Sequence, residues 1–131
     1  MRFTIDRIDH IVITCADLEK TASWYQRVLG MERETFGANR RTALRFGSQK
    51  LNLHQAGAEF QPNAAAARPG TIDICFITGI PAPSIVAHLT ACGVPVEEGP
   101  VEKIGALGPM SSVYCRDPDG NLIEIASYLS L

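Results

Sequence analysis

The chain has 131 residues, of which 46% are hydrophobic, and its formal net charge at pH 7 is −2. A chain of this length can bury a sizeable core as one domain, whereas each half alone would be marginally stable. The basic residues are scattered rather than clustered, which argues against nucleic acid or an anionic membrane as partner and favours a small molecule.

The amino terminus and the cysteines together predict a cytoplasmic protein. Residues 1–6 contain charges and lead directly into a predicted strand, unlike a secretory signal. No apolar stretch approaches the length that spans a membrane. The four cysteines form no close CxxC pair and are expected to be reduced, mostly buried thiols: Cys15, Cys75, Cys92 and Cys115.

The first half of the chain predicts one helix and four strands. Alternation of apolar residues places His10 on one face of the first strand, and Asn52 and His54 share the polar face of the last. Asp17 is the expected N-cap of the helix, which ends before Gly30. The strands are expected at residues 8–14, 32–36, 42–46 and 50–55.

The second half repeats this order after a connector at residues 56–70. A strand is expected at 72–78, a helix at 84–92 and a short strand at 94–97. The stretch that contains Gly99, Gly105, Gly108 and Pro109 predicts a loop that could hinge over a pocket. The final hairpin has strands at 110–116 and 122–128, joined by the turn residues Asp117–Asn121.

The two halves align as copies of one βαβββ unit. Adding 63 takes His10 to Asp73, and adding 70 takes His54 to Glu124. The second copy therefore has seven more residues, expected between residues 97 and 109. By this alignment His10, His54 and Glu124 lie at corresponding strand positions.

Two imidazoles and one carboxylate can occupy one face of a metal ion and leave other positions open for substrate oxygens. A single histidine in a strand is more often a hydrogen-bonded core residue, but His10 and His54 are two of only three histidines. Glu124 could alternatively form a buried ion pair with Arg45 or Arg116. The combined pattern favours a metal-dependent enzyme.

Two motifs resemble those of the vicinal oxygen chelate superfamily, which includes glyoxalase I, fosfomycin-resistance thiol transferases, methylmalonyl-CoA epimerase and extradiol dioxygenases. They are the opening Asp9-His10-Ile11-Val12 and the closing Asp117-Pro-Asp-Gly-Asn-Leu-Ile-Glu124. The chain is most similar to small glyoxalase-domain, lactoylglutathione-lyase-like proteins. That similarity lies in three stretches, Lys50–His54, Asp73–Cys75 and Glu97–Pro100.

The resemblance implies an α+β fold in which two βαβββ modules form a curved mixed sheet. Residues 1–131 would be a single domain, with modules at about 5–56 and about 71–129. The implied metal ligands are His10, His54, Asp73 and Glu124. Asp73 stands where many members have histidine, so it is expected to be a fourth ligand, an outer-shell acceptor or a catalytic base. The implied cofactor is a divalent ion: Ni, Co, Mn, Zn or Fe(II).

The implied activity is that of a lyase or isomerase of glyoxalase type, acting on a small substrate chelated through two adjacent oxygens. Glu124 or Asp73 would move a proton in this reaction. The alternatives are a metal-dependent dioxygenase and a metal-free small-molecule binding module of the bleomycin-resistance kind. A glutathione substrate would also need cations, for which Arg40, Arg41, Lys50 and Lys103 are candidates. Members of this size are commonly homodimers, and the same is expected here.

Overall fold

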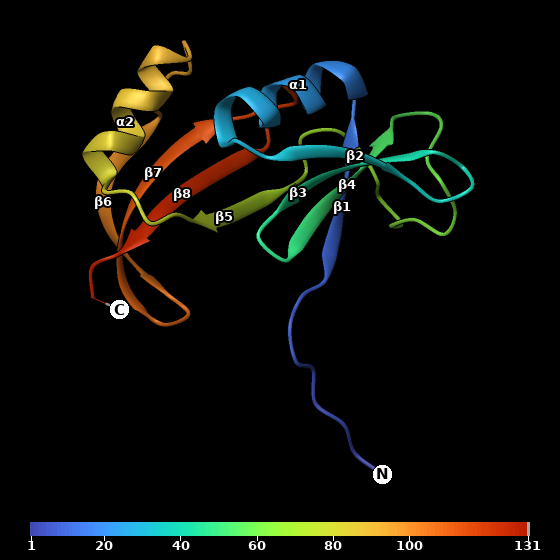
Figure 1. Ribbon diagram of the computed structural model, residues 1–131, viewed down its shortest axis with the longest axis horizontal. Helices are drawn as coiled ribbons and strands as arrows, with labels where there is room; N and C mark the ends of the chain where they lie inside the picture. Colours follow the sequence, from blue (N-terminus) through green and yellow to red (C-terminus); the bar gives the residue numbers. More distant parts are fainter. Residues whose placement is uncertain (131) are drawn as a thin grey trace. The chain divides into compact units, whose positions relative to one another are not determined.

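The computed structural model describes residues 1–130 and has an α+β fold of two four-stranded mixed sheets and two helices (Figure 1). The chain divides into two compact units, Met1–Arg68 and Pro69–Leu131, and each contains one βαβββ module. The predicted fold class is therefore confirmed. Unit 1 holds β1 (His10–Cys15), α1 (Leu18–Leu29), β2 (Glu32–Phe36), β3 (Arg41–Phe46) and β4 (Gln49–Gln55). Unit 2 holds β5 (Asp73–Ile77), α2 (Ala82–Ala91), β6 (Glu98–Gly105), β7 (Gly108–Arg116) and β8 (Leu122–Tyr128).

In unit 1 the strand order is β1-β4-β3-β2, with β1 and β4 parallel and the other neighbours antiparallel. The helix α1 packs on this sheet and buries Tyr25 and Val28. Both predicted helix ends are confirmed. The Asp17 side chain accepts a hydrogen bond from the Lys20 backbone N–H at 3.1 Å, and Gly30 ends the helix with a φ of 65°.

Unit 2 repeats this topology, with the order β5-β8-β7-β6 and parallel pairing of β5 with β8. The helix α2 packs on β6, β7 and β8 and buries Ala82, Ile85 and Leu89. Within residues 1–130, no helix is long and apolar enough to cross a membrane.

The structure corrects two predictions for the segment after α2. Residues 94–97 do not form a strand, and the expected loop from Gly99 to Pro109 instead contains most of β6 and the start of β7. β6 is an edge strand, and its pairing with β7 shifts register between Glu98 and Val101. An edge strand tolerates glycine and proline because only one side of its backbone is paired.

The turn Asp117–Asn121 joins β7 to β8 and also holds β5. Oδ2 of Asp117 accepts a hydrogen bond from the Asn121 side-chain amide at 2.7 Å, and both side chains are buried. Oδ1 of Asn121 accepts the backbone N–H of Ile72 at 2.9 Å. The turn therefore fixes the start of β5 against the start of β8. In the resulting register, Glu124 of β8 pairs with Cys75 of β5.

Candidate active site

His10 has the local arrangement of a metal-ligating histidine. It is the first residue of β1, and its side chain is 43% exposed. Nδ1 lies 2.8 Å from Oδ1 of Asp9, and this hydrogen bond lowers the pKa of the Asp9 carboxyl below its ordinary value. A carboxylate that holds one imidazole nitrogen orients the ring and leaves the other nitrogen, Nε2, available for a ligand.

His54 lies too far along the sheet to share an ion with His10 within unit 1. The parallel register pairs His10 with Lys50 and His54 with Thr14, so the two histidines are four positions apart on neighbouring strands. Four positions correspond to about 13 Å along the strands. Two imidazoles on one ion bring their nitrogens within about 4 Å, because each metal–nitrogen bond is about 2 Å long. The register therefore separates the two histidines that the sequence repeat had placed in one site.

His54 has a buried environment of its own. The residue is 3% exposed, and within residues 1–130 its Nδ1 has no hydrogen-bond partner. Its ring packs edge-on against Phe60, with 5.4 Å between the ring centroids. Desolvation lowers the pKa of His54, and the positive charge of Arg41 lowers it further, while Glu59 opposes the shift. Both of the lowering effects favour the neutral form of the imidazole.

The strand registers identify Asn52 as the unit 1 counterpart of Glu124. Asn52 lies two positions beyond the residue that pairs with His10, and Glu124 lies two positions beyond the residue that pairs with Asp73. The sequence repeat had assigned this place to His54, two residues away on the same face. Asn52 is 6% exposed, and within the described residues its Oδ1 has no partner.

Glu124 is half-buried and does not form either of the ion pairs left open by the sequence. Arg45 pairs instead with Glu34, and Arg116 pairs with Glu97. In the described part of the chain, Oε2 of Glu124 is buried without a hydrogen-bond partner. A carboxylate oxygen in this condition is suited to accept a ligand, because burial without a partner costs free energy.

Tyr114 and Cys75 flank Glu124 on the neighbouring strands β7 and β5. Burial, the charge of Glu124 and hydrogen bonding to that carboxylate raise the pKa of Tyr114 to about 12. Desolvation of the thiol and then the charge of Glu124 raise the pKa of Cys75 to about 11. The sequence predicted mostly buried cysteines, whereas Cys75 is exposed. Both groups stay protonated at neutral pH, so Tyr114 presents a hydroxyl hydrogen beside the carboxylate.

The sequence prediction did not identify Tyr114. The signal that could have found it is the hairpin turn Asp117–Asn121, because a turn of known length sets which residues of its two strands face each other. Asp73 is the exposed first residue of β5, and its charge contributes to the raised pKa of Cys75.

Within residues 1–130, no group of three or more His, Cys, Asp or Glu side chains is arranged to hold a metal ion. Each unit nevertheless supplies suitable donors. His10 and Asn52 lie on one face of the unit 1 sheet, and Asp73 and Glu124 lie on one face of the unit 2 sheet. The unpartnered oxygens of Asn52 and Glu124 fit the requirement for ligand atoms, and metal binding stays a prediction.

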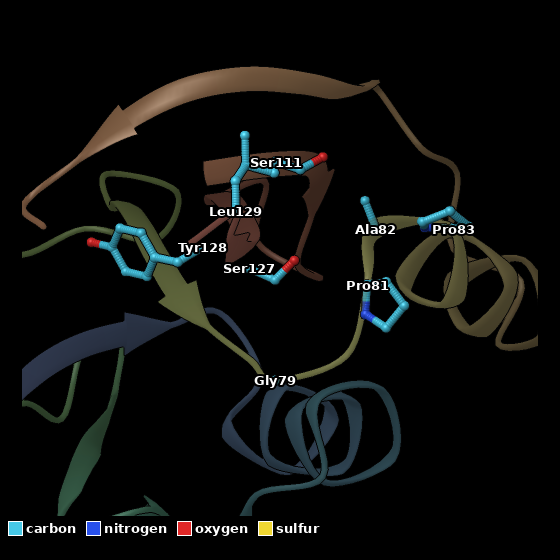
Figure 2. Close-up of a pocket in the computed structure, with 8 residues that line it drawn as sticks. All are labelled: Gly79, Pro81, Ala82, Pro83, Ser111, Ser127, Tyr128 and Leu129. Atoms are coloured by element: carbon cyan, nitrogen blue, oxygen red, sulfur yellow. The ribbon is translucent and has the colours of Figure 1, made fainter. Parts of the chain in front are cut away.

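Unit 2 also contains a cavity of about 370 Å³ that involves none of the predicted site residues. Figure 2 shows residues at the start of α2 on one side of this cavity and residues of β7, β8 and the segment after β8 on the other. Its lining is formed by Gly79, Pro81, Ala82, Pro83, Ser111, Ser127, Tyr128 and Leu129.

Comparisons with known proteins place this architecture in one family. A family model for the Glyoxalase/Bleomycin resistance protein/Dioxygenase superfamily matches residues 7–125. Virulence protein STM3117 of Salmonella typhimurium is 49% identical over 129 residues, which cover 98% of this chain and 89% of that protein. The crystal structure of STM3117 matches with a TM-score of 0.94, covering 97% of this chain and 100% of that chain. The glyoxalase domain-containing protein RDO1 of Mycosarcoma maydis is 49% identical over 127 residues, which cover 97% of this chain and 71% of that protein.

A lactoylglutathione lyase from Agrobacterium tumefaciens shares the fold, with 23% identity, a TM-score of 0.72 and 95% of each chain covered. The names of the two relatives at 49% identity state no reaction, so they establish the family and not the activity. The chain belongs to the Glyoxalase/Bleomycin resistance protein/Dioxygenase superfamily.

Proposed function

We propose that the chain is a metal-dependent lyase or isomerase of glyoxalase type, which acts on a small substrate through two adjacent oxygen atoms. The observation that carries this proposal is the state of Glu124, a half-buried carboxylate with one buried oxygen that has no partner within residues 1–130. The protonated hydroxyl of Tyr114 beside it hydrogen-bonds to this carboxylate and would help to hold it in position for a ligand.

His10, Asp73 and Glu124 are the proposed ligands, and the oxygen of Asn52 is a further candidate. One imidazole and two carboxylates suit a divalent ion that accepts mixed nitrogen and oxygen donors, such as Ni, Co, Mn, Zn or Fe(II). The ion would supply Lewis-acid stabilisation of the negative charge that develops on the two substrate oxygens. His54 is left out of this ligand set because the β1–β4 register separates it from His10.

The protein groups would carry out the proton transfer. A carboxylate, Glu124 or Asp73, accepts the proton from the carbon next to the substrate carbonyl and returns it to the neighbouring carbon. Tyr114 positions the Glu124 carboxylate through the hydrogen bond between them. Asp9 holds His10 in one orientation through its contact with Nδ1.

We propose that the protein is a homodimer, that it lies in the cytoplasm and that its partner is a small-molecule substrate. The superfamily membership and the scattered basic residues support a small molecule as the partner. Sedimentation analysis of the purified protein tests the dimer. One chain has a mass of 14.2 kDa, and the particle in solution is expected to have twice that mass.

Metal analysis of purified variants tests the function. Wild-type protein is expected to take up roughly one divalent ion per chain, and His10→Ala and Glu124→Ala are expected to lower the affinity at least about tenfold. His88→Ala is the matched control, because His88 lies on α2, outside the proposed ligand set. Uptake by none of the four proteins would leave the metal-free binding module as the function, and equal uptake by all four would remove His10 and Glu124 from the ligand set.

A further inference from the structure

Arg41 is held by an aromatic ring instead of a carboxylate. Its Cζ lies 4.3 Å from the centroid of the Phe60 ring. Three other arginines, Arg33, Arg45 and Arg116, each pair with a glutamate, whereas Arg41 forms no ion pair within residues 1–130. A guanidinium stacked on a ring keeps the N–H groups at its edge available, because the stacking uses only the flat face.

His54 lies beside Arg41, and within residues 1–130 its Nδ1 has no hydrogen-bond partner. Thr42 of β3 pairs with Leu53 of β4, so Arg41 and His54 lie next to each other along the same two strands and on the same face. Phe60, from the segment after β4, contacts both side chains. We call Arg41, His54 and Phe60 the Arg41 cluster.

The Arg41 cluster combines buried hydrogen-bonding capacity with positive charge. His54 is 97% buried, and the structure describes no partner for its Nδ1 in residues 1–130. The guanidinium of Arg41 supplies the positive charge in the cluster. Glu59 is the nearby carboxylate, and the backbone N–H of Gly57 donates to its Oε2 at 3.0 Å.

We propose that the Arg41 cluster binds the carboxylate group of a small organic anion. Two edge N–H groups of Arg41 donate to the two carboxylate oxygens, and the imidazole N–H of His54 donates to one of them. The anion thereby supplies a partner for the guanidinium and for the buried imidazole nitrogen. Phe60 holds the guanidinium in place, which reduces the freedom that Arg41 loses on binding.

None of the three residues of the Arg41 cluster belongs to the proposed ligand set, so the proposed binding of the carboxylate needs no metal. The inference rests on the proposed function in one respect only, which is that the bound anion is then the substrate. In that case the substrate carries a carboxylate in addition to its two adjacent oxygens.

Calorimetric titration of the full chain with benzoate and benzamide, in the presence of EDTA, tests the proposal. The two probes have similar shape, and only benzoate is charged. We expect benzoate to bind at least about tenfold more tightly than benzamide, because a charge-assisted bidentate pair is stronger than neutral hydrogen bonds.

Variants identify the groups responsible. Arg41→Ala is expected to weaken benzoate binding at least about tenfold, and Arg41→Lys to recover only part of it, because lysine keeps the charge without the planar fork. Arg45→Ala is the matched control on the same strand and is expected to bind benzoate like the wild type. His54→Gln is expected to weaken binding, and thermal unfolding of each variant checks that it is folded.

Equal binding of benzoate and benzamide by the wild type, no benzoate binding, or an equal loss in Arg41→Ala and Arg45→Ala would each overturn the proposal. These outcomes are independent of the metal analysis. If the chain binds benzoate through Arg41 and takes up no metal, the proposal for the Arg41 cluster stands and the proposed enzymatic function is wrong.

Discussion

Oδ1 of Asn121 accepts a hydrogen bond from the backbone N–H of Ile72 at 2.9 Å, so a residue of the last turn holds the strand that opens unit 2. Asn121 is 1% exposed and also donates to Asp117. We expect Asn121→Ala to lower the free energy of unfolding by about 2–3 kcal/mol, because it leaves buried polar groups without partners. Urea denaturation measures this change.

The matched control is Asn63→Ala, which removes an exposed hydrogen bond from the Asn63 amide to the Phe60 carbonyl oxygen. Its free energy of unfolding is expected to change by less than about 0.5 kcal/mol. Similar losses in the Asn121 and Asn63 variants would contradict the structural role assigned to Asn121.

Gly99 occupies a backbone position that no other residue can adopt without strain. Its φ is +111°, and a Cβ there would clash with the backbone carbonyl oxygen of Ser112. We expect Gly99→Ala to destabilise the fold by about 2–5 kcal/mol, through strain and overpacking together. Gly47 has a φ of +52°, and a Cβ there would meet no atom within 4 Å, so Gly47→Ala should cost only about 1–2 kcal/mol. Thermal unfolding of both variants decides whether the clash matters.

The pKa of Tyr114, about 12, should fall when the neighbouring carboxylate is neutralised. Deprotonation of Tyr114 beside Glu124 places two negative charges together, and Glu124→Gln removes this repulsion. Burial is the largest cause and remains, so the new pKa should lie between 10 and 12. Alkaline titration of phenolate absorbance in metal-free protein measures it, with Tyr114→Phe identifying the signal. An unchanged midpoint would show that Glu124 does not act on Tyr114.

Asp9→Asn should weaken metal binding although the proposed ligand His10 is still present in the sequence. The Asp9 carboxylate orients the imidazole, and loss of such a partner typically lowers metal affinity about 10- to 100-fold. Asp6→Asn, in the exposed segment before β1, is the control and should bind metal like the wild type. The measurement is calorimetric titration with Mn or Zn. Equal affinity in both variants would remove Asp9 from the proposed site.

The repeat and the strand alternation predicted most of the fold. α1, β2 and β8 begin and end where their patterns and caps indicated. The error came at β6, where Gly99 and Pro100 indicated a loop. Those residues are compatible with a strand only at the edge of a sheet, and the position of a strand within its sheet is not encoded in its own residues.

The faces of the site residues were predicted, and their role as ligands stays a prediction. The sequence placed His10 on one face of its strand and Glu124 on the same face as Leu122, and the strand pairings agree with these faces. It assigned His54 to the position that the registers give to Asn52. It also did not foresee the contact of Phe60 with Arg41 and His54, because a loop residue carries no periodic signal that indicates where its side chain packs.

The amino-acid sequence by itself determined most of the secondary structure, the duplication and the faces on which the polar residues lie, because side-chain periodicity and helix caps act over a few residues. Only the tertiary structure decided which polar residues stand side by side. A strand displaced by two residues keeps every side chain on its face. The hydrogen bonds between β1 and β4, which join segments about forty residues apart in the sequence, choose among such registers.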